Sequence, residues 1–170
     1  PLVDNDNVQA GFDATEYFIK KGCKRIAFIG GTKRLFVTQD RLTGYESALK
    51  QHQLPIDTNL TYFATEFLEE KGYQFSELLF NHDPQIDAII TTDSLLAEGV
   101  CDYISKYQLK VPVLSFDSVN PRLDLVAYVD INSLELGRVS FETILQIIND
   151  AKNNKQICYR QLIEHKIIEK

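Results

Sequence analysis

Short, unbroken runs of apolar residues recur along the chain and predict buried strands. Every residue from Ile26 to Ile29 is apolar, and so is every residue from Ala88 to Ile90. A strand that is apolar at every position is typical of a parallel sheet covered by helices on both faces. Together with a β-type stretch around Tyr62, this pattern predicts strands at Arg25–Ile29, Leu60–Ala64, Asp87–Thr91, Val111–Ser115 and Leu125–Val129.

Segments with a single apolar stripe alternate with these runs and predict amphipathic helices. Asn5 or Asp6 can cap the first helix, which extends to about Lys21, and Gly22 is a natural residue to end it. Four more helices are predicted, namely from the loop Thr32–Leu42 to about Gln51, over Gly72–Phe80, from Asp93 or Ser94 to about Tyr107, and from Ser133 to about Asp150. The apolar stripe of the last helix comprises Leu136, Val139, Ile144, Ile147 and Ile148.

The tail Ile157–Ile168 looks extended, with β-type residues interrupted by charges. Elsewhere strands and helices alternate, and the connections are long enough for right-handed crossovers. We therefore predict an α/β fold built on a doubly wound parallel sheet.

Composition narrows the class of protein. The chain has 170 residues and 44% hydrophobic content, which is enough for one globular unit with a real core. Its net charge of −6 makes it a poor candidate for binding DNA phosphates directly. The three cysteines are far apart, so free buried thiols in a reducing compartment are expected. No apolar stretch approaches the length of a membrane span, and no signal peptide is recognised at the start of the sequence. The complete lack of methionine leads us to expect a fragment of a longer protein.

Three polar residues fall at or just past predicted strand ends, namely Arg41, Asp93 and Asp117. In an open α/β sheet, ligands bind outside the carboxyl ends of the strands. Two carboxylates and one forked guanidinium match the hydroxyl groups of a sugar. Phe67 and Phe116, at the exits of the second and fourth predicted strands, can supply apolar faces for a sugar ring.

Each of these residues also has a simpler interpretation. Asp93 can act as a helix N-cap without contacting a ligand, and this role is as well supported as a ligand contact. Arg41 can pair with Asp40 or Asp13 on the surface, and the two phenylalanines can belong to the core. Asp117 is the hardest to explain otherwise, because an aspartate directly after a strand has no capping role.

Other chemistries find little support. His52, His82 and His165 lack the spacing of metal ligands and are expected on the solvated surface. No serine has the context of a nucleophile elbow. Gly30 and Gly31 lack the pattern of a phosphate-binding loop and are attributed to a turn that needs positive φ. A glycoside-processing enzyme using the two aspartates as a carboxylate pair is an alternative, but no feature supplies water activation, so no enzyme, metal or cofactor is predicted.

Five segments, in the right order and near the right spacing, resemble the effector-binding core of the lactose/galactose-repressor family of bacterial transcription regulators. Within that family the chain is most similar to repressors of maltose or maltodextrin operons. Two departures concern Asp93, which stands where relatives usually carry a neutral polar residue, and Lys110–Val113, which is shorter than usual. The matching segments are Gly11–Gly31, Asp40–Leu49, Asp87–Val100, Val113–Ser118 and Asp130–Arg138.

The resemblance implies a periplasmic-binding-protein-like architecture of two lobes, with the effector between them and a helix-turn-helix headpiece before them. Residues 6–129 and 158–170 would form the second lobe. Residues 130–157 would return to the first lobe, and residues 1–5 would be the crossover between lobes. The DNA-binding headpiece would be absent.

The resemblance also implies roles. Arg41 falls on the effector-contacting arginine, Asp117 on the aspartate that accepts sugar hydroxyls, and Phe67 on an aromatic pocket position. A cytoplasmic homodimer is implied, with the Leu95–Ile104 helix near its interface, operator DNA bound through the missing headpiece, and a phosphocarrier protein as a possible co-regulator. Sugar binding would shift the lobes and thereby change DNA affinity. An alternative function with the same two-lobe architecture is that of an exported solute-binding protein for sugar uptake.

Overall fold

A computed structural model describes residues 2–117, 120–153 and 158–170. Pro1, Ser118 and Ile157, which the predictions above included, lie outside these ranges. In chain order the elements are β1 (Leu2–Asn5), α1 (Asn7–Lys20), β2 (Ile26–Gly30), α2 (Phe36–Gln51), the 3-10 helix η1 (Thr58–Leu60), β3 (Thr61–Phe63), α3 (Glu69–His82), β4 (Ala88–Thr91), α4 (Ser94–Lys106), β5 (Val113–Phe116), β6 (Ala127–Asp130), α5 (Ser133–Lys152), β7 (Arg160–Ile163) and β8 (Lys166–Glu169).

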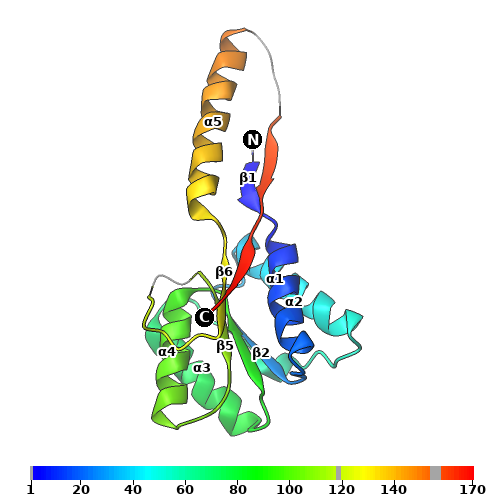
Figure 1. The fold of residues 1–170 in the computed structure, drawn as a ribbon, viewed down its shortest axis with the longest axis vertical. Coiled ribbons are helices and arrows are strands. Elements are labelled where there is room, and N and C mark those ends of the chain that lie inside the picture. The colour runs from blue at the N-terminus through cyan, green and yellow to red at the C-terminus, as the bar shows by residue number, and fades with distance from the viewer. Residues whose placement is uncertain (1, 118–119, 154–157) are drawn as a thin grey trace.

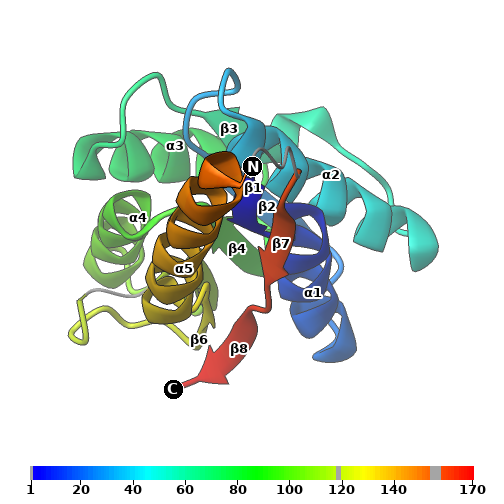
Figure 2. The same cartoon turned by 90° about the horizontal axis from the view of Figure 1, so that it is seen from above.

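A six-stranded sheet in the order β3-β2-β4-β5-β6-β8 organises most of the chain. The first five strands are parallel and β8 is antiparallel to β6. The helices α1 and α2 cover one face, and α3 and α4 cover the other (Figure 2). The predicted doubly wound parallel sheet is confirmed, and the extended tail adds an antiparallel edge strand to it.

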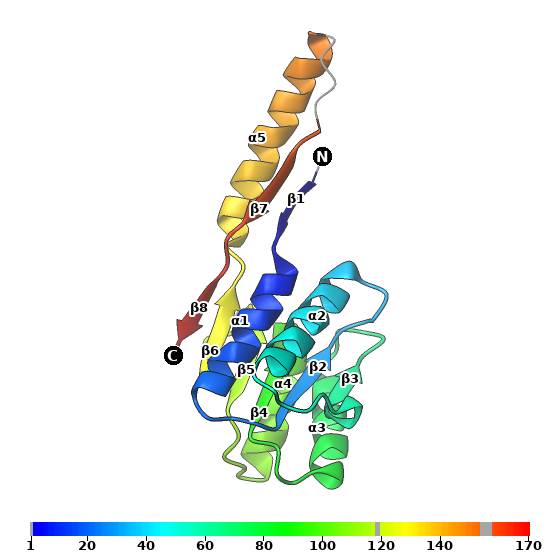
Figure 3. The ribbon, with the colours of Figure 1, turned by 90° about the vertical axis from the view of Figure 1, so that its right-hand side faces the viewer.

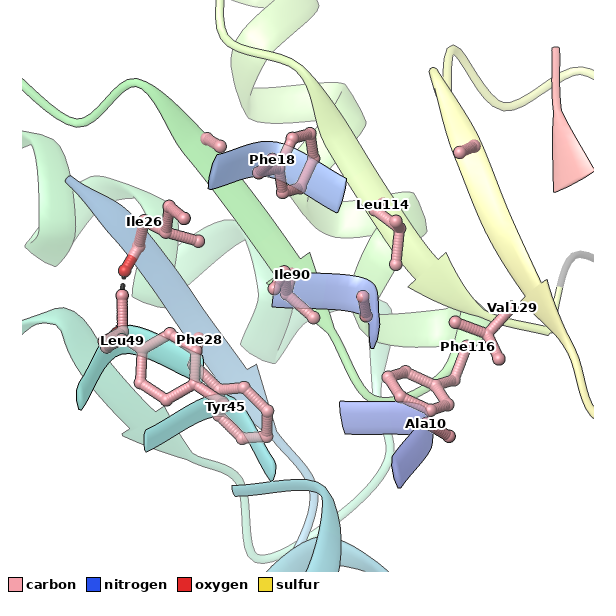
Figure 4. Close-up of a cluster of buried hydrophobic side chains, with 13 residues drawn as sticks. Ala10, Phe18, Ile26, Phe28, Tyr45, Leu49, Ile90, Leu114, Phe116 and Val129 are labelled. Carbon is pink, nitrogen blue, oxygen red and sulfur yellow. Dashed lines mark hydrogen bonds between the residues drawn. The ribbon is translucent and has the colours of Figure 1, made fainter. Parts of the chain in front are cut away.

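The sheet separates two hydrophobic clusters. All five residues of β2 are buried, and successive side chains alternate between the faces. Ile26 and Phe28 pack against α1 and α2, whereas Ala27 and Ile29 belong to the cluster under α3 and α4. Figure 4 shows the first cluster, where the hydroxyl of Tyr45 donates to the carbonyl oxygen of Ile26 at 2.8 Å. This central burial fixes the strand ends that carry the polar residues.

A second part of the molecule stands away from the sheet (Figures 1 and 3). The strands β1 and β7 pair in parallel as a separate two-stranded sheet, with α5 beside them. We call β1, β7 and α5 the arm, and the six-stranded sheet with α1–α4 the body. The chain passes between them after β1, after β6 and between β7 and β8. Of the extended tail, only β8 joins the body.

Several boundaries differ from the predicted ones. The helix α2 begins at Phe36, so the loop expected over Thr32–Leu42 is shorter and Arg41 lies inside the helix. No side chain caps this start, because Leu35 occupies the N-cap position, and the sequence therefore gave no capping signal. The helix α3 also begins earlier than predicted, at Glu69. Its first turn is acidic, and acidic side chains interact favourably with the positive N-terminal end of the helix dipole.

Gly22 has the role expected of it, whereas Gly30 and Gly31 do not. Among the described residues the positive-φ glycine is Gly22, at +93°, which follows α1 as predicted. Gly30 and Gly31 do not need positive φ. Gly31 instead packs closely against the ring of Phe67, which would have to shift to make room for a Cβ at this position.

Candidate functional site

The carboxyl edge of the sheet carries the candidate site. In the parallel part of the sheet, the winding direction reverses between β2 and β4, and ligands bind at such switch points. Nearby, a cavity of about 440 Å³ opens beside the ends of β4, β5 and β6, lined by Asp93, Ser94, Asp117, Tyr128, Asp130, Ile131 and Ser133. A cavity of about 500 Å³ lies between α4 and the start of β5, but at the amino ends of the strands. The first cavity is therefore the better candidate.

Arg41 is held beside this edge by neutral partners. Its side chain points from α2 into the body and the residue is only 7% exposed. The Nε atom donates to Oδ1 of Asn7 at 3.0 Å, and Nη1 donates to the carbonyl oxygen of Thr92 at 2.7 Å. The guanidinium carbon lies 3.9 Å from the ring centroid of Phe116. The alternative of surface pairing with an aspartate is therefore wrong.

The charge of Arg41 survives its burial. Burial lowers the pKa of Arg41 to about 10, while the carboxylates of Asp117, Asp93 and Asp4 act in the opposite direction. A guanidinium with this pKa remains protonated at neutral pH. Its remaining nitrogen, Nη2, has no hydrogen-bond acceptor among the residues that the structure describes. The site thus holds a fixed cation, and its Nη2 remains available to donate hydrogen bonds to a ligand.

Asp117 lies directly after β5 in an uncommon conformation. Its φ of +58° is left-handed, a region that aspartate enters more readily than most residues. Its backbone N–H donates to the carbonyl oxygen of Val129 at 3.0 Å, which extends the β5–β6 ladder by one bond. Burial raises the pKa of Asp117; Arg41 counteracts this shift and Asp130 adds to it. The carboxylate is therefore poorly compensated at the cavity.

Asp93 performs the simpler of its two expected roles. It is the N-cap of α4, and its Oδ1 accepts from the N–H of Leu96 at 3.0 Å. Burial raises the pKa of Asp93, although the N–H groups of Leu96 and Leu95 favour its charged form. The residue also lines the cavity, so capping does not remove it from the site.

The two aromatic candidates differ in what they offer. Phe116 is fully buried, and Arg41 covers its ring, so it supports Arg41 rather than presenting a face to a sugar. Phe67 is 38% exposed in the segment before α3. Its ring lies against Gly31 and is not part of the cavity wall. The structure thus brings Arg41, Phe116, Asp117 and Asp93 together, and of these Asp117 and Asp93 line the cavity. Phe67 lies at the periphery.

Sequence reasoning missed three members of this edge. Asn7 and Thr92 hold Arg41, and nothing in their sequence context marks them for that role. Asp130 lines the cavity at the end of β6. Its position at a strand end is the same signal that identified Asp117, and it would have found Asp130 as well.

Two expectations about other reactive residues need correction. The side chain of His165 is only 10% exposed and its Nε2 lies 2.9 Å from Oδ2 of Asp13, so it is not a solvated surface histidine. Cys158 is exposed, whereas Cys23 and Cys101 are partly buried free thiols. Within the described ranges, no cluster of histidine, cysteine and acidic residues is arranged to hold a metal ion.

Known proteins are similar to this chain in sequence and in fold. A family model described as the periplasmic binding protein-like domain matches residues 15–166. The HTH-type transcriptional regulator MalR of Streptococcus pneumoniae is 84% identical over 170 residues, which are 100% of this chain and 52% of the regulator. The chain therefore spans about half the length of these curated relatives.

Solved structures of transcriptional regulators share the fold of this chain. A regulatory protein of the LacI family from Chloroflexus aggregans has a TM-score of 0.87 at 26% identity, over 98% of this chain and 62% of that one. A complex of the transcriptional regulator CelR with cellobiose has a TM-score of 0.85 at 22% identity, over 98% of this chain and 52% of that one, which shows a shared fold. None of the described helices is long and apolar enough to cross a membrane. The chain belongs to the periplasmic binding protein-like domain family, in the form that makes the effector-binding core of LacI-family transcriptional regulators.

Proposed function

We propose that this chain is the sensing core of a sugar-responsive transcriptional repressor and that it binds a small saccharide of the maltose or maltodextrin type. The observation that carries the proposal is that a buried, protonated Arg41 and the half-buried Asp117 lie at the carboxyl edge of the sheet, where Asp117 lines a cavity of about 440 Å³. The saccharide would lie between this edge and a first lobe, and would control DNA binding by a helix-turn-helix region.

The chemistry of the edge favours a neutral ligand rich in hydroxyl groups. Asp117, Asp93 and Asp130 offer carboxylate oxygens that accept hydrogen bonds, and Nη2 of Arg41 offers a donor. A sugar hydroxyl both donates and accepts, so vicinal hydroxyls can use both kinds of group. Phe67, which is 38% exposed and lies outside the cavity wall, is proposed to contact the apolar face of a sugar ring.

Lobe assignments follow the same proposal. Residues 6–129 with the tail from 158 would be the second lobe, and 130–157 the returning part of the first. Within this tail, β7 pairs with β1 in the arm and β8 pairs with β6 in the body. We propose a cytoplasmic homodimer with the Leu95–Ile104 region near its interface, operator DNA as a partner and a phosphocarrier protein as a co-regulator.

The relatives support a regulator over the alternatives. The relative at 84% identity is an HTH-type transcriptional regulator, which favours a repressor over an exported solute-binding protein or an enzyme. Asp93 is already committed to capping α4, which weakens its use as half of a hydrolytic carboxylate pair. The residues that precede Pro1 would discriminate further, since a repressor needs a basic helix-turn-helix there and an exported protein needs a signal peptide.

Calorimetric titration of the full-length protein with maltose and maltotriose tests the proposal. We expect Asp117→Ala and Arg41→Ala each to weaken binding by about 1.5–3 kcal/mol, because each removes a charged hydrogen-bond partner. Asp124→Ala and Arg122→Ala, both exposed in the loop that precedes β6, are matched controls that should bind as the unmodified protein does. Unchanged affinity in the two site variants would remove these residues from the site.

A further inference from the structure

One buried asparagine joins all three crossings between body and arm. Asn5 ends β1 and is 6% exposed. Its Nδ2 donates to the carbonyl oxygens of Ile131 and Ile163, both at 2.9 Å. Ile131 lies in the crossing from β6 to α5, and Ile163 is the last residue of β7 before the third crossing. A single amide group therefore fixes the spacing of the three segments that connect the two parts.

A second buried asparagine connects this junction to the candidate site. Asn7, 5% exposed, accepts from Nε of Arg41 at 3.0 Å through its Oδ1. Its Nδ2 donates to the carbonyl oxygen of Asn5 at 3.3 Å and lies 3.4 Å from Oδ1 of Asp4. The two ends of one side chain thus contact the arginine of the site and the backbone of the first crossing.

We propose that Asn7 is a positioning residue for Arg41, and that Asn7 and Asn5 together form a relay that couples the effector site to the three crossings. This inference rests on the proposed function and adds the route by which a bound saccharide reaches the arm. Residues Asn7 and Asn5 do not contact the saccharide themselves. They transmit the position of the guanidinium to the segments about which the lobes turn.

The physical basis is the cost of leaving buried polar groups without partners. Both asparagines sit where water does not compensate for a lost hydrogen bond, so their bonds form or break together rather than stretch gradually. A guanidinium that shifts to meet a ligand must carry Asn7 with it or lose the bond to Oδ1. Either response changes the hydrogen bonding of the first crossing. Coupling of this kind requires an element with discrete arrangements that both sites influence.

Three variants of the full-length protein separate positioning from coupling. Asn7→Ala removes both functions of the side chain. Asn7→Asp keeps an oxygen acceptor for Arg41 but loses the donor toward Asn5. Asn5→Asp loses both donors to the crossings and leaves the Arg41 bond to Asn7 intact. Asn81→Ala and Asn81→Asp, exposed on α3, are matched controls.

The readouts are saccharide affinity by calorimetry and operator affinity with and without saturating maltose. The ratio of the two operator affinities is the coupling factor, about 5- to 150-fold in typical allosteric proteins. We expect Asn7→Ala to lower saccharide affinity at least about tenfold and Asn7→Asp to restore most of it. We expect Asn5→Asp and Asn7→Asp to reduce the coupling factor at least about threefold, with saccharide affinity close to that of the unmodified protein.

Two outcomes overturn the relay. One is an Asn7→Ala protein with unchanged saccharide affinity, and the other is an unchanged coupling factor in both aspartate variants. Thermal unfolding of each variant measures whether the substitution destabilises the whole protein. General destabilisation would not explain a loss of saccharide affinity in Asn7→Ala that Asn7→Asp restores. An unmodified protein that neither binds maltose nor changes its operator affinity overturns the proposed function itself. A responsive protein with equally responsive asparagine variants overturns the relay alone.

Discussion

The body and the arm use apolar residues in opposite ways. In the body, two clusters on either face of the sheet are closed to solvent, with Phe28, Phe116 and Leu114 fully buried. In the arm, α5 exposes large apolar side chains, including Phe141 at 63% and Leu134 at 86%. The sequences of α1 and α4 in the body are about as amphipathic as that of α5 in the arm. An apolar stripe therefore establishes that a helix has a face to bury, but not that the same chain segment buries it.

The difference shows most clearly within α5. The predicted stripe includes Val139, which is buried, and Ile144 and Ile148, which remain 54% and 48% exposed. Thr143 Oγ1 is buried without a hydrogen-bond partner among the described residues. Among the described residues, both buried hydrophobic clusters belong to the body, so the stabilities of the two parts should respond differently to the same mutation.

The largest expected effect compares one phenylalanine from each part. In the 170-residue chain, Phe28→Ala should lower the free energy of unfolding by about 3–5 kcal/mol, because it leaves a cavity between β2 and α2. Phe141→Ala should change it by less than about 0.5 kcal/mol, because the exposed ring leaves no cavity. Urea denaturation of both variants, followed by circular dichroism, makes the measurement. Equal losses would show that the arm contributes to the same core as the body.

Local sequence pattern predicted the elements of the body well, because a fully buried strand must be apolar at every position. The start of α2 could not be predicted, since Leu35 in the N-cap position provides no capping signal. The separate pairing of β7 with β1 was also beyond the sequence. Both strands look like ordinary extended segments, and their partner is decided by contacts between residues about 160 positions apart, as for Leu2 and Arg160.

A smaller effect is expected where the arm joins the body. His165, in the third crossing, contacts Asp13 on α1 at 2.9 Å and is largely buried. A double-mutant cycle of His165→Ala and Asp13→Ala should give a coupling of about 0.5–1.5 kcal/mol in the free energy of unfolding. Chemical denaturation of the four proteins provides the values. Additive effects would show that the third crossing is held to the body by other contacts, such as those of Asn5.

The candidate site was only partly predictable, for a physical reason. Residues that end a strand are visible in sequence, and this signal identified Asp117 and Asp93 and would have identified Asp130. Residues that hold another side chain are not visible, because their role depends on which elements meet in space. Asn5 and Asn7 belong to this second kind. Phe116 was identified at a strand end, but its role beneath the guanidinium of Arg41 was not.

The smallest expected effect concerns the edge of the body that faces the arm. Because the pKa of Asp117 is raised in the folded protein, its charged form costs stability above that pKa. Asp117→Asn removes this cost, so at pH 7 we expect a stability gain below about 1 kcal/mol, since solvent screens a half-buried carboxylate. The gain should shrink as the pH falls through the raised pKa, and vanish below the ordinary value of 3.8, where both side chains are neutral. Thermal unfolding of both proteins from pH 7 to pH 3 tests this. A lower midpoint for the variant at pH 7 would mean that attraction to Arg41 outweighs the cost of burial, and that this edge is held together by the same charges that are proposed to bind the sugar.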